Sequence, residues 1–148
     1  MTLLAFGDSE LVFFDHDFSY LSIICSFISL FIGIIMTQSG LDKIFNWEGE
    51  LDFMTEKFSK TIIANFSTFG LIQVTILETL SGLLSLLGSI MVLFYDDESH
   101  GVVGLILAAV SFCVLMAGQR ISKDYEGSAV LVPYFLLTMI GLFMYSNN

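Results

Sequence analysis

A glutamate inside an otherwise uncharged apolar segment is the first candidate for chemistry in this sequence. Glu78 falls within an apolar stretch that runs from about residue 67 to 95. An ionisable group in a membrane span is costly, so it faces the bundle interior and has either a partner or a task. The favoured interpretation is a structural hydrogen bond or ion pair that fixes helix register; proton or quinone handling and direct catalysis are the alternatives.

Two basic residues are candidates for the partner of Glu78. Lys43 follows the end of the first apolar segment, on the same side of the membrane as the start of the segment that holds Glu78. Its long stem lets the ammonium group reach back along its own helix. Arg120, at the end of the third apolar segment, emerges on that side too and is the alternative partner. Lys43 and Glu78 are therefore the candidate polar pair, and no catalytic residue is assigned.

The two histidines are weak candidates for a metal site. His16 and His100 both lie among aspartates and glutamates on the predicted outer side. Imidazole and carboxylate groups together bind divalent cations. Solvated acidic loops with incidental histidines are the favoured interpretation, so we predict neither a metal nor a resident cofactor.

The composition indicates a membrane protein. Hydrophobic residues make up 55% of the 148 residues and charged residues 14%, and the mean hydropathy is +0.84. A soluble domain carries roughly a quarter of charged residues, so this chain has too few to cover itself in water. Its net charge of −10 excludes a nucleic-acid partner, which requires a basic surface.

Four apolar segments qualify as membrane spans, which need about 20 residues as helix. They cover about residues 20–40, 67–95, 101–119 and 129–145. Backbone groups exposed to lipid must be paired within the segment, so all four are expected to be helices. The predicted fold is all-α: one membrane domain over residues 1–148, built as a four-helix bundle. Pro133 is expected in the first turn of the fourth helix, where proline costs little.

Two further segments have an amphipathic character. Residues 1–19 mix aromatic and acidic side chains, which suits a segment that lies in the membrane interface or against a partner. The connector 41–66 contains Leu51, Met54, Phe58 and Ile62 at helical spacing. This spacing predicts an amphipathic interfacial helix between the first two spans, with Trp47 as an anchor.

The distribution of basic residues predicts an orientation. All five lie in two of the connecting segments: Lys43, Lys57, Lys60, Arg120 and Lys123. The positive-inside rule puts both of these loops in the cytoplasm. Both termini are then extracytoplasmic, and the expected location is a bacterial inner membrane.

Small residues mark the faces where helices are expected to pack. Lipid gives no hydrophobic drive for association between helices, so close backbone contact must provide it. The candidate packing residues are Gly33, Gly40, Ser81, Gly82, Ser85, Gly88, Gly104 and Gly118.

Two of these patterns resemble a known family. Gly40-Leu-Asp-Lys43 ends the first span, and Glu78-Thr-Leu-Ser-Gly82 continues to Gly88 in the second. Both resemble the DoxX family of small four-helix membrane proteins. The resemblance implies a membrane subunit associated with thiosulfate:quinone oxidoreductases or with complexes that handle oxidative or thiol stress.

Three functions are compatible with these features. The first is a non-catalytic accessory or anchor subunit of a larger respiratory or redox complex, with other membrane subunits as partners and quinone reached through the complex. The second is a small proton-coupled transporter or channel that uses Glu78. The third is a quinone- or lipid-modifying enzyme, which would need a second polar catalytic group within the bundle.

Overall fold

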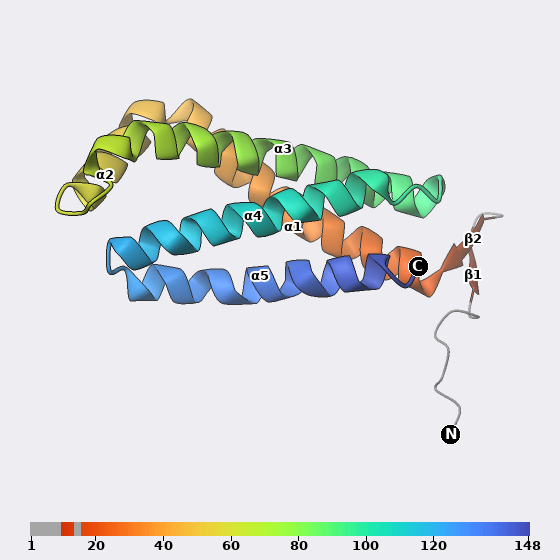
Figure 1. Cartoon of the computed structure of the whole chain (residues 1–148). Helices are drawn as coiled ribbons and strands as arrows, with labels where there is room; N and C mark the ends of the chain where they lie inside the picture. Colours follow the sequence, from red (N-terminus) through yellow and green to blue (C-terminus); the bar gives the residue numbers. More distant parts are fainter. Residues whose placement is uncertain (1–9, 14–15) are drawn as a thin grey trace, which may run out of the picture.

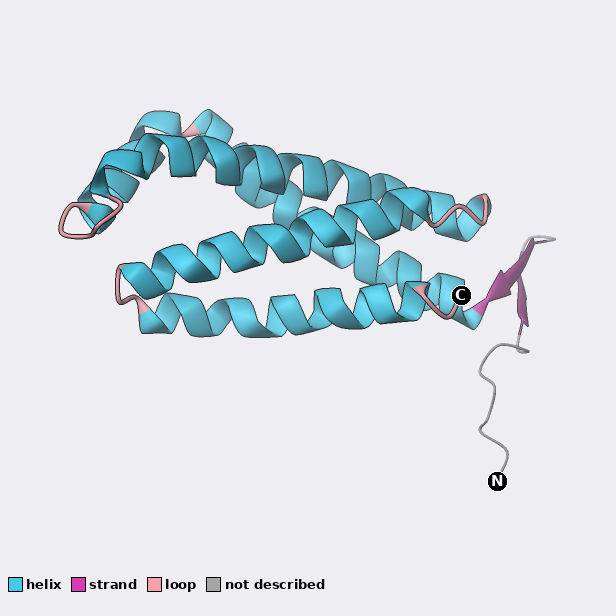
Figure 2. Cartoon of the chain, in the orientation of Figure 1, coloured by secondary structure: helices cyan, strands magenta, loops and turns pink. Residues whose placement is uncertain are grey.

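Four long helices form the frame of the protein, as the computed structural model shows for residues 10–13 and 16–148 (Figures 1 and 2). They are α1 (Tyr20–Phe45), α3 (Ser67–Phe94), α4 (Ser99–Ile121) and α5 (Tyr125–Tyr145). Each is long and apolar enough to cross a membrane. The predicted all-α bundle of four membrane spans is therefore confirmed.

The boundaries of the spans differ most from the predicted ones at the end of α1, which continues five residues further, to Phe45, and at the start of α5. This helix begins four residues early because the Asp124 carboxylate accepts a hydrogen bond of 2.9 Å from the backbone N–H of Gly127, which caps the first turn. Pro133 consequently lies inside α5, and its prediction as a first-turn residue is wrong. A proline inside a helix leaves the carbonyl four residues earlier without its usual partner.

The connector between α1 and α3 contains the expected amphipathic helix. Helix α2 (Trp47–Phe58) packs against α3, and a short 3-10 turn, η2 (Ala64–Phe66), leads into α3. Phe58 is buried, whereas Ile62 is 91% exposed and lies outside the helix, so the prediction for Ile62 is wrong. The helix ends earlier because the chain turns at this point, where the N–H of Thr61 bonds the carbonyl of Phe58 at 2.9 Å.

A short antiparallel hairpin precedes α1. It pairs β1 (Glu10–Phe13) with β2 (His16–Ser19), and Ser19 then caps α1 by accepting a hydrogen bond from the N–H of Leu21. The sequence pattern did not predict this hairpin. Residues 1–9 and 14–15 lie outside the described residues, and the expected interfacial or partner-contacting role of segment 1–19 stays a prediction.

Helices α1 and α3 approach closely at Gly40 and Gly82, as they also do at Gly33. A Cβ added to Gly82 would lie 2.8 Å from Cα of Thr37, and one added to Gly40 would lie 2.9 Å from the backbone nitrogen of Thr79. No real Cβ fits at these distances without a backbone shift. The two glycines therefore allow the backbones to touch, as expected when lipid supplies no hydrophobic drive.

The interface between α3 and α4 uses the same device. Gly104 lies against the backbone of Ser85, and Gly88 lies against Gly101. The hydroxyl of Ser81 donates a hydrogen bond of 2.9 Å to the carbonyl of Gly104. Hydroxyl donors of this kind hold helices together inside the apolar bundle.

The remaining two candidate packing glycines differ from each other. A Cβ on Gly33 would lie 2.9 Å from both the backbone nitrogen and the side chain of Leu86 in α3, and one on Gly118 would lie 3.4 Å from the ring of Phe58 in α2. The first is a close approach of spans. The second is ordinary contact, and it places α2 against the end of α4.

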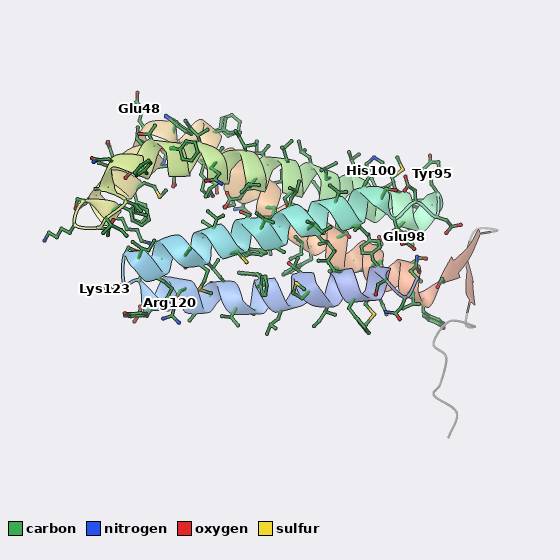
Figure 3. The ribbon with its side chains drawn as sticks, in the orientation of Figure 1. Glu48, Tyr95, Glu98, His100, Arg120 and Lys123 are labelled. Carbon is green, nitrogen blue, oxygen red and sulfur yellow. The ribbon has the colours of Figure 1, made fainter. Side chains whose placement is uncertain are left out.

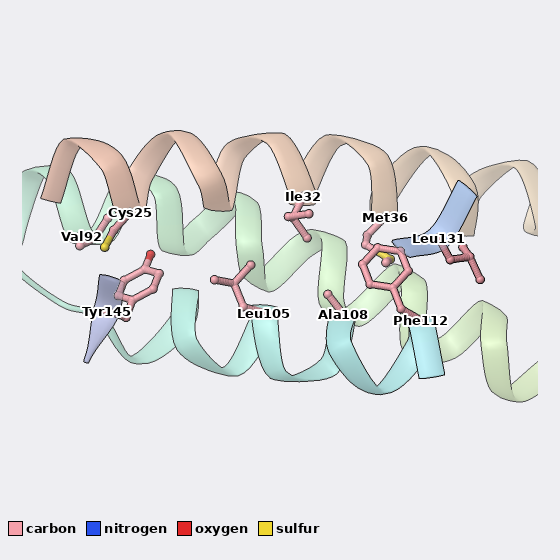
Figure 4. Packing of buried hydrophobic residues seen from close by; sticks show 9 residues of the cluster. All are labelled: Cys25, Ile32, Met36, Val92, Leu105, Ala108, Phe112, Leu131 and Tyr145. Carbon is pink, nitrogen blue, oxygen red and sulfur yellow. The ribbon is translucent and has the colours of Figure 1, made fainter. Parts of the chain in front are cut away.

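A buried apolar cluster runs through the bundle (Figure 4). Its members are Cys25, Ile32, Met36, Val92, Leu105, Ala108, Phe112, Leu131 and Tyr145. At one end the hydroxyls of Tyr145 and Ser29 are hydrogen-bonded at 2.8 Å, which ties α5 to α1. Large apolar side chains cover the outer faces, for example Phe27, Phe69 and Phe143, as expected for surfaces that meet lipid or other subunits.

The lysines and the arginine lie at one end of the bundle, together with the acidic side chains of α2. Arg120 and Lys123 lie at the end where α4 joins α5, whereas Glu98 and His100 lie at the opposite end (Figure 3). Lys43, in the last turn of α1, and Lys57, bonded to the α4–α5 loop, belong to the basic end. The topology thus gathers both basic loops at one end, and which end faces the cytoplasm stays a prediction.

We expect Gly82→Ala to lower the free energy of unfolding by about 1–3 kcal/mol, because the new methyl group overpacks against Thr37. Gly70→Ala is the matched control on α3, since its Cβ would meet only the end of the Met54 side chain at 3.9 Å. Both changes raise helix propensity equally. Reversible SDS unfolding in mixed micelles measures the difference, and equal stability of the two variants would contradict the close approach.

Candidate functional site

The candidate pair predicted from the sequence is an ion pair in the structure. The Nζ of Lys43 lies 2.8 Å from Oε2 of Glu78. Glu78 is 1% exposed and Lys43 is 16% exposed, so the carboxylate is buried within the bundle. Lys43 extends from the last turn of α1, and Glu78 lies within α3.

Ser39 completes the surroundings of the Lys43 ammonium group. Lys43 Nζ donates to Oγ of Ser39 at 2.9 Å and to its carbonyl oxygen at 3.3 Å. An ammonium group has three N–H donors, and Glu78 with the two Ser39 oxygens provides three acceptors. Ser39 was not singled out from the sequence, although its position four residues before Lys43 puts both on one helix face.

The close approach of α1 and α3 is what brings the pair together. Gly40 lies three residues before Lys43 and faces Thr79, the residue that follows Glu78. Gly82 lies four residues after Glu78 and faces Thr37. The ion pair therefore sits beside two points at which the helix backbones touch, and this contact fixes the distance between the charges.

Arg120, the alternative partner, lies elsewhere. Its guanidinium group stacks over the ring of Tyr125 at 5.2 Å, a cation–π geometry. Within residues 16–148 the structure shows an ion pair between Glu78 and Lys43, and none between Glu78 and Arg120. Arg120 thus belongs to the α4–α5 corner.

A pocket of about 350 Å³ opens beside the pair. Lys43 contributes to its lining, whereas Glu78 lies behind Lys43. The walls come from α2, the start of α3 and the end of α4. They include Glu50, Phe53, Met54, Lys57, Phe58, Phe66, Gly70, Val74, Leu115 and Gln119. The sequence pattern did not predict this pocket, because its walls come from helices far apart in the chain.

A second ion pair holds α2 over this pocket. Lys57 Nζ donates a hydrogen bond of 2.7 Å to Oδ2 of Asp124, and the same ammonium lies 5.3 Å from the ring centre of Phe53. Asp124 also caps α5. The bond therefore links the interfacial helix to the α4–α5 loop.

The two weak metal candidates lie in different elements, His16 in β2 and His100 in α4. His100 lies 3.4 Å from Asp97, and His16 belongs to β2, where the structure describes the backbone pairing. Hydrogen bonds from Ser99 hold the pKa of Asp97 below its usual range. Residues 16–148 contain no cluster of three or more His, Cys, Asp or Glu side chains suited to a metal ion.

We expect Glu78→Ala to destabilise the bundle by about 3–5 kcal/mol, because it leaves the Lys43 charge buried without its partner. Glu78→Gln should cost less, since its amide oxygen still accepts a hydrogen bond from Lys43. The double variant Lys43→Met/Glu78→Leu should lose less free energy of unfolding than the losses of the two single variants added together. SDS unfolding of the four proteins tests this, and additive effects would contradict a direct pair.

The Lys57–Asp124 pair predicts a pH-dependent attachment of α2. Hydrogen bonds from Lys57 and from the Gly127 N–H lower the pKa of Asp124 below its ordinary 3.8. The pair therefore stabilises the folded state above that value and is lost as the pH falls through the lowered pKa. Carbon-detected NMR should show Asp124 titrating below 3.8, and Asp124→Asn should speed hydrogen exchange in α2 at pH 7. Unchanged exchange would contradict the attachment.

Comparison of the chain with protein-family models, with curated proteins and with solved structures finds no match. The site is accordingly defined by its own geometry: a buried Lys43–Glu78 pair, two glycine contacts and an adjoining pocket. The DoxX resemblance stays an expectation drawn from the sequence.

Proposed function

We propose that the chain is a membrane subunit of a larger redox complex that delivers electrons to a membrane quinone. The observation that carries the proposal is the buried Lys43–Glu78 pair beside an apolar pocket. The five residues behind the DoxX resemblance add support, since Gly40, Lys43, Glu78 and Gly82 surround one helix contact and Gly88 lies further along α3.

The chemistry of quinone reduction gives the pair a task. Two electrons and two protons convert the two carbonyl groups of a quinone into two hydroxyl groups. In the proposal the electrons come from a substrate that a partner subunit oxidises, such as a reduced sulfur compound or a thiol. Lys43 faces the pocket and Glu78 lies behind it, so the pair holds a proton at a fixed place and can pass it toward a ligand oxygen.

An accessory role also fits the polar inventory of the bundle. The Lys43–Glu78–Ser39 cluster holds and moves a proton, and oxidation of the electron donor falls to the partner. Broad apolar faces on α1, α3 and α5, with Phe31, Phe94 and Phe143 exposed, offer surface for lipid and for neighbouring subunits.

Isolation of the native particle tests this proposal. The chain, tagged at its own locus and extracted in a mild detergent, should co-purify with stoichiometric redox subunits, identified by native gel electrophoresis and mass spectrometry. The particle should reduce a short-chain quinone, and Glu78→Gln should slow that reduction while the particle remains assembled, because the amide does not carry the proton.

Two results would argue against it. A chain that purifies alone or as a homo-oligomer would remove the accessory role, and proton flux in liposomes that depends on Glu78 would then favour the transporter. Full quinone reduction by both Glu78→Gln and Glu78→Ala in an intact particle would leave the pair a purely structural role.

A further inference from the structure

We infer that the pocket between α2, α3 and α4 binds the head of an uncharged amphiphile that donates hydroxyl hydrogen bonds. The inference rests on the pocket itself, and it rests on the proposed function only where the amphiphile is a reduced quinone. Three properties of the lining carry it: size, charge balance and the kind of free polar group.

The size and the walls suit one end of a lipid-soluble molecule. A volume of about 350 Å³ falls in the range of small-molecule sites, which are mostly apolar with a few polar groups. The apolar walls come from α2, η2, α3 and α4, and include Phe53, Phe58, Phe66, Val74 and Leu115. A ring or the first part of a hydrocarbon chain fits such walls.

The charge balance disfavours an anionic head. Both cations of the lining are already engaged, Lys43 with Glu78 at 2.8 Å and Lys57 with Asp124 at 2.7 Å. Glu50 also lines the pocket, and the ion pairs within residues 16–148 do not include it. An anionic head would therefore find its cations neutralised and would face a carboxylate.

A cationic head is disfavoured for a related reason. It would enter beside the ammonium groups of Lys43 and Lys57, which both line the pocket. It would also lose its hydration in an apolar site, a cost that only a well-placed ion pair offsets. An uncharged head avoids both penalties.

Two hydrogen-bond acceptors of the lining are available to a ligand. The Glu50 carboxylate accepts only. Oε1 of Gln119 is buried and has no hydrogen-bond partner among the described residues. The donors of Lys43, in contrast, are used by Glu78 and Ser39. A ligand that matches this lining brings donors, which a hydroxyl group supplies and a quinone carbonyl does not.

Binding to the full chain in lipid nanodiscs tests the inference, with empty nanodiscs as baseline. The probes share a ten-carbon chain: a decyl hydroquinone kept anaerobic, the corresponding decyl quinone, a monoacylglycerol, decanoate and decylamine. We expect at least one hydroxylated probe to bind about tenfold more tightly than the quinone, the acid and the amine, as one hydrogen bond to a charged acceptor provides.

Three variants show where the probe binds. Glu50→Gln should weaken binding about tenfold, and Glu48→Gln, the same charge change on the exposed face of α2, should leave it unchanged. Gly70→Leu should abolish binding by filling the pocket, because only the end of the Met54 side chain lies near its Cβ. Gly70→Leu and Glu50→Gln act by different means, so a folding defect in one leaves the other informative.

Each outcome decides between the ligands. Tight binding of the hydroquinone supports the pocket and the proposed function together. Binding of the monoacylglycerol alone supports the pocket and counts against quinone as its ligand. Equal or tighter binding of decyl quinone, decanoate or decylamine would overturn the inference, as would hydroxylated-probe binding that neither Gly70→Leu nor Glu50→Gln alters.

Discussion

The contact of the α1 and α3 backbones is the constraint on which the rest of the structure depends. In lipid, an apolar side chain gains no hydrophobic free energy when it exchanges contact with lipid for contact with another helix. Helices therefore associate through close packing and hydrogen bonds between them. Gly40 and Gly82 permit that packing, and the ion pair of Lys43 with Glu78 lies next to the contact of Gly40 with Thr79. A buried charged pair is stable only when its geometry is held tightly. The glycines let the two backbones touch, and this contact holds Lys43 and Glu78 at the distance of an ion pair.

The interfacial helix α2 forms one wall of the pocket beside the buried pair. It is anchored by the bond of Lys57 to Asp124 and by the contact of Phe58 with Gly118. Lys43 takes part both in the buried ion pair and in the lining of the pocket. Structural stability and the proposed ligand binding thus depend on the same few residues at this end of the bundle.

The four spans and their packing faces could be predicted from the sequence, because hydropathy and small residues act locally. Charge and reach favoured Lys43 as the partner of Glu78 and left Arg120 as the alternative. The crossing of α1 and α3 places Lys43 against Glu78, and Arg120 stacks on Tyr125 instead. Pro133 was misplaced because the cap of α5 depends on one side-chain bond. Gln119 could be noticed only as a polar residue near a span end. Its place in the pocket wall depends on how α2 folds back against α3 and α4. The spacing of residues along the sequence does not show this.

Helix α5 is less buried in the bundle than the other three spans. It packs against α4 and α1, and 22% of its most apolar stretch is buried, against 33–39% for the others. Its internal proline removes one backbone hydrogen bond. At its far end, the hydroxyl of Tyr145 is hydrogen-bonded to the hydroxyl of Ser29 in α1. The ion pair joins α1 to α3 without a contribution from α5, and α5 follows these helices in the chain. Assembly can therefore proceed in two stages, in which α1, α3 and α4 associate in the bilayer and α5 then docks against them from the side.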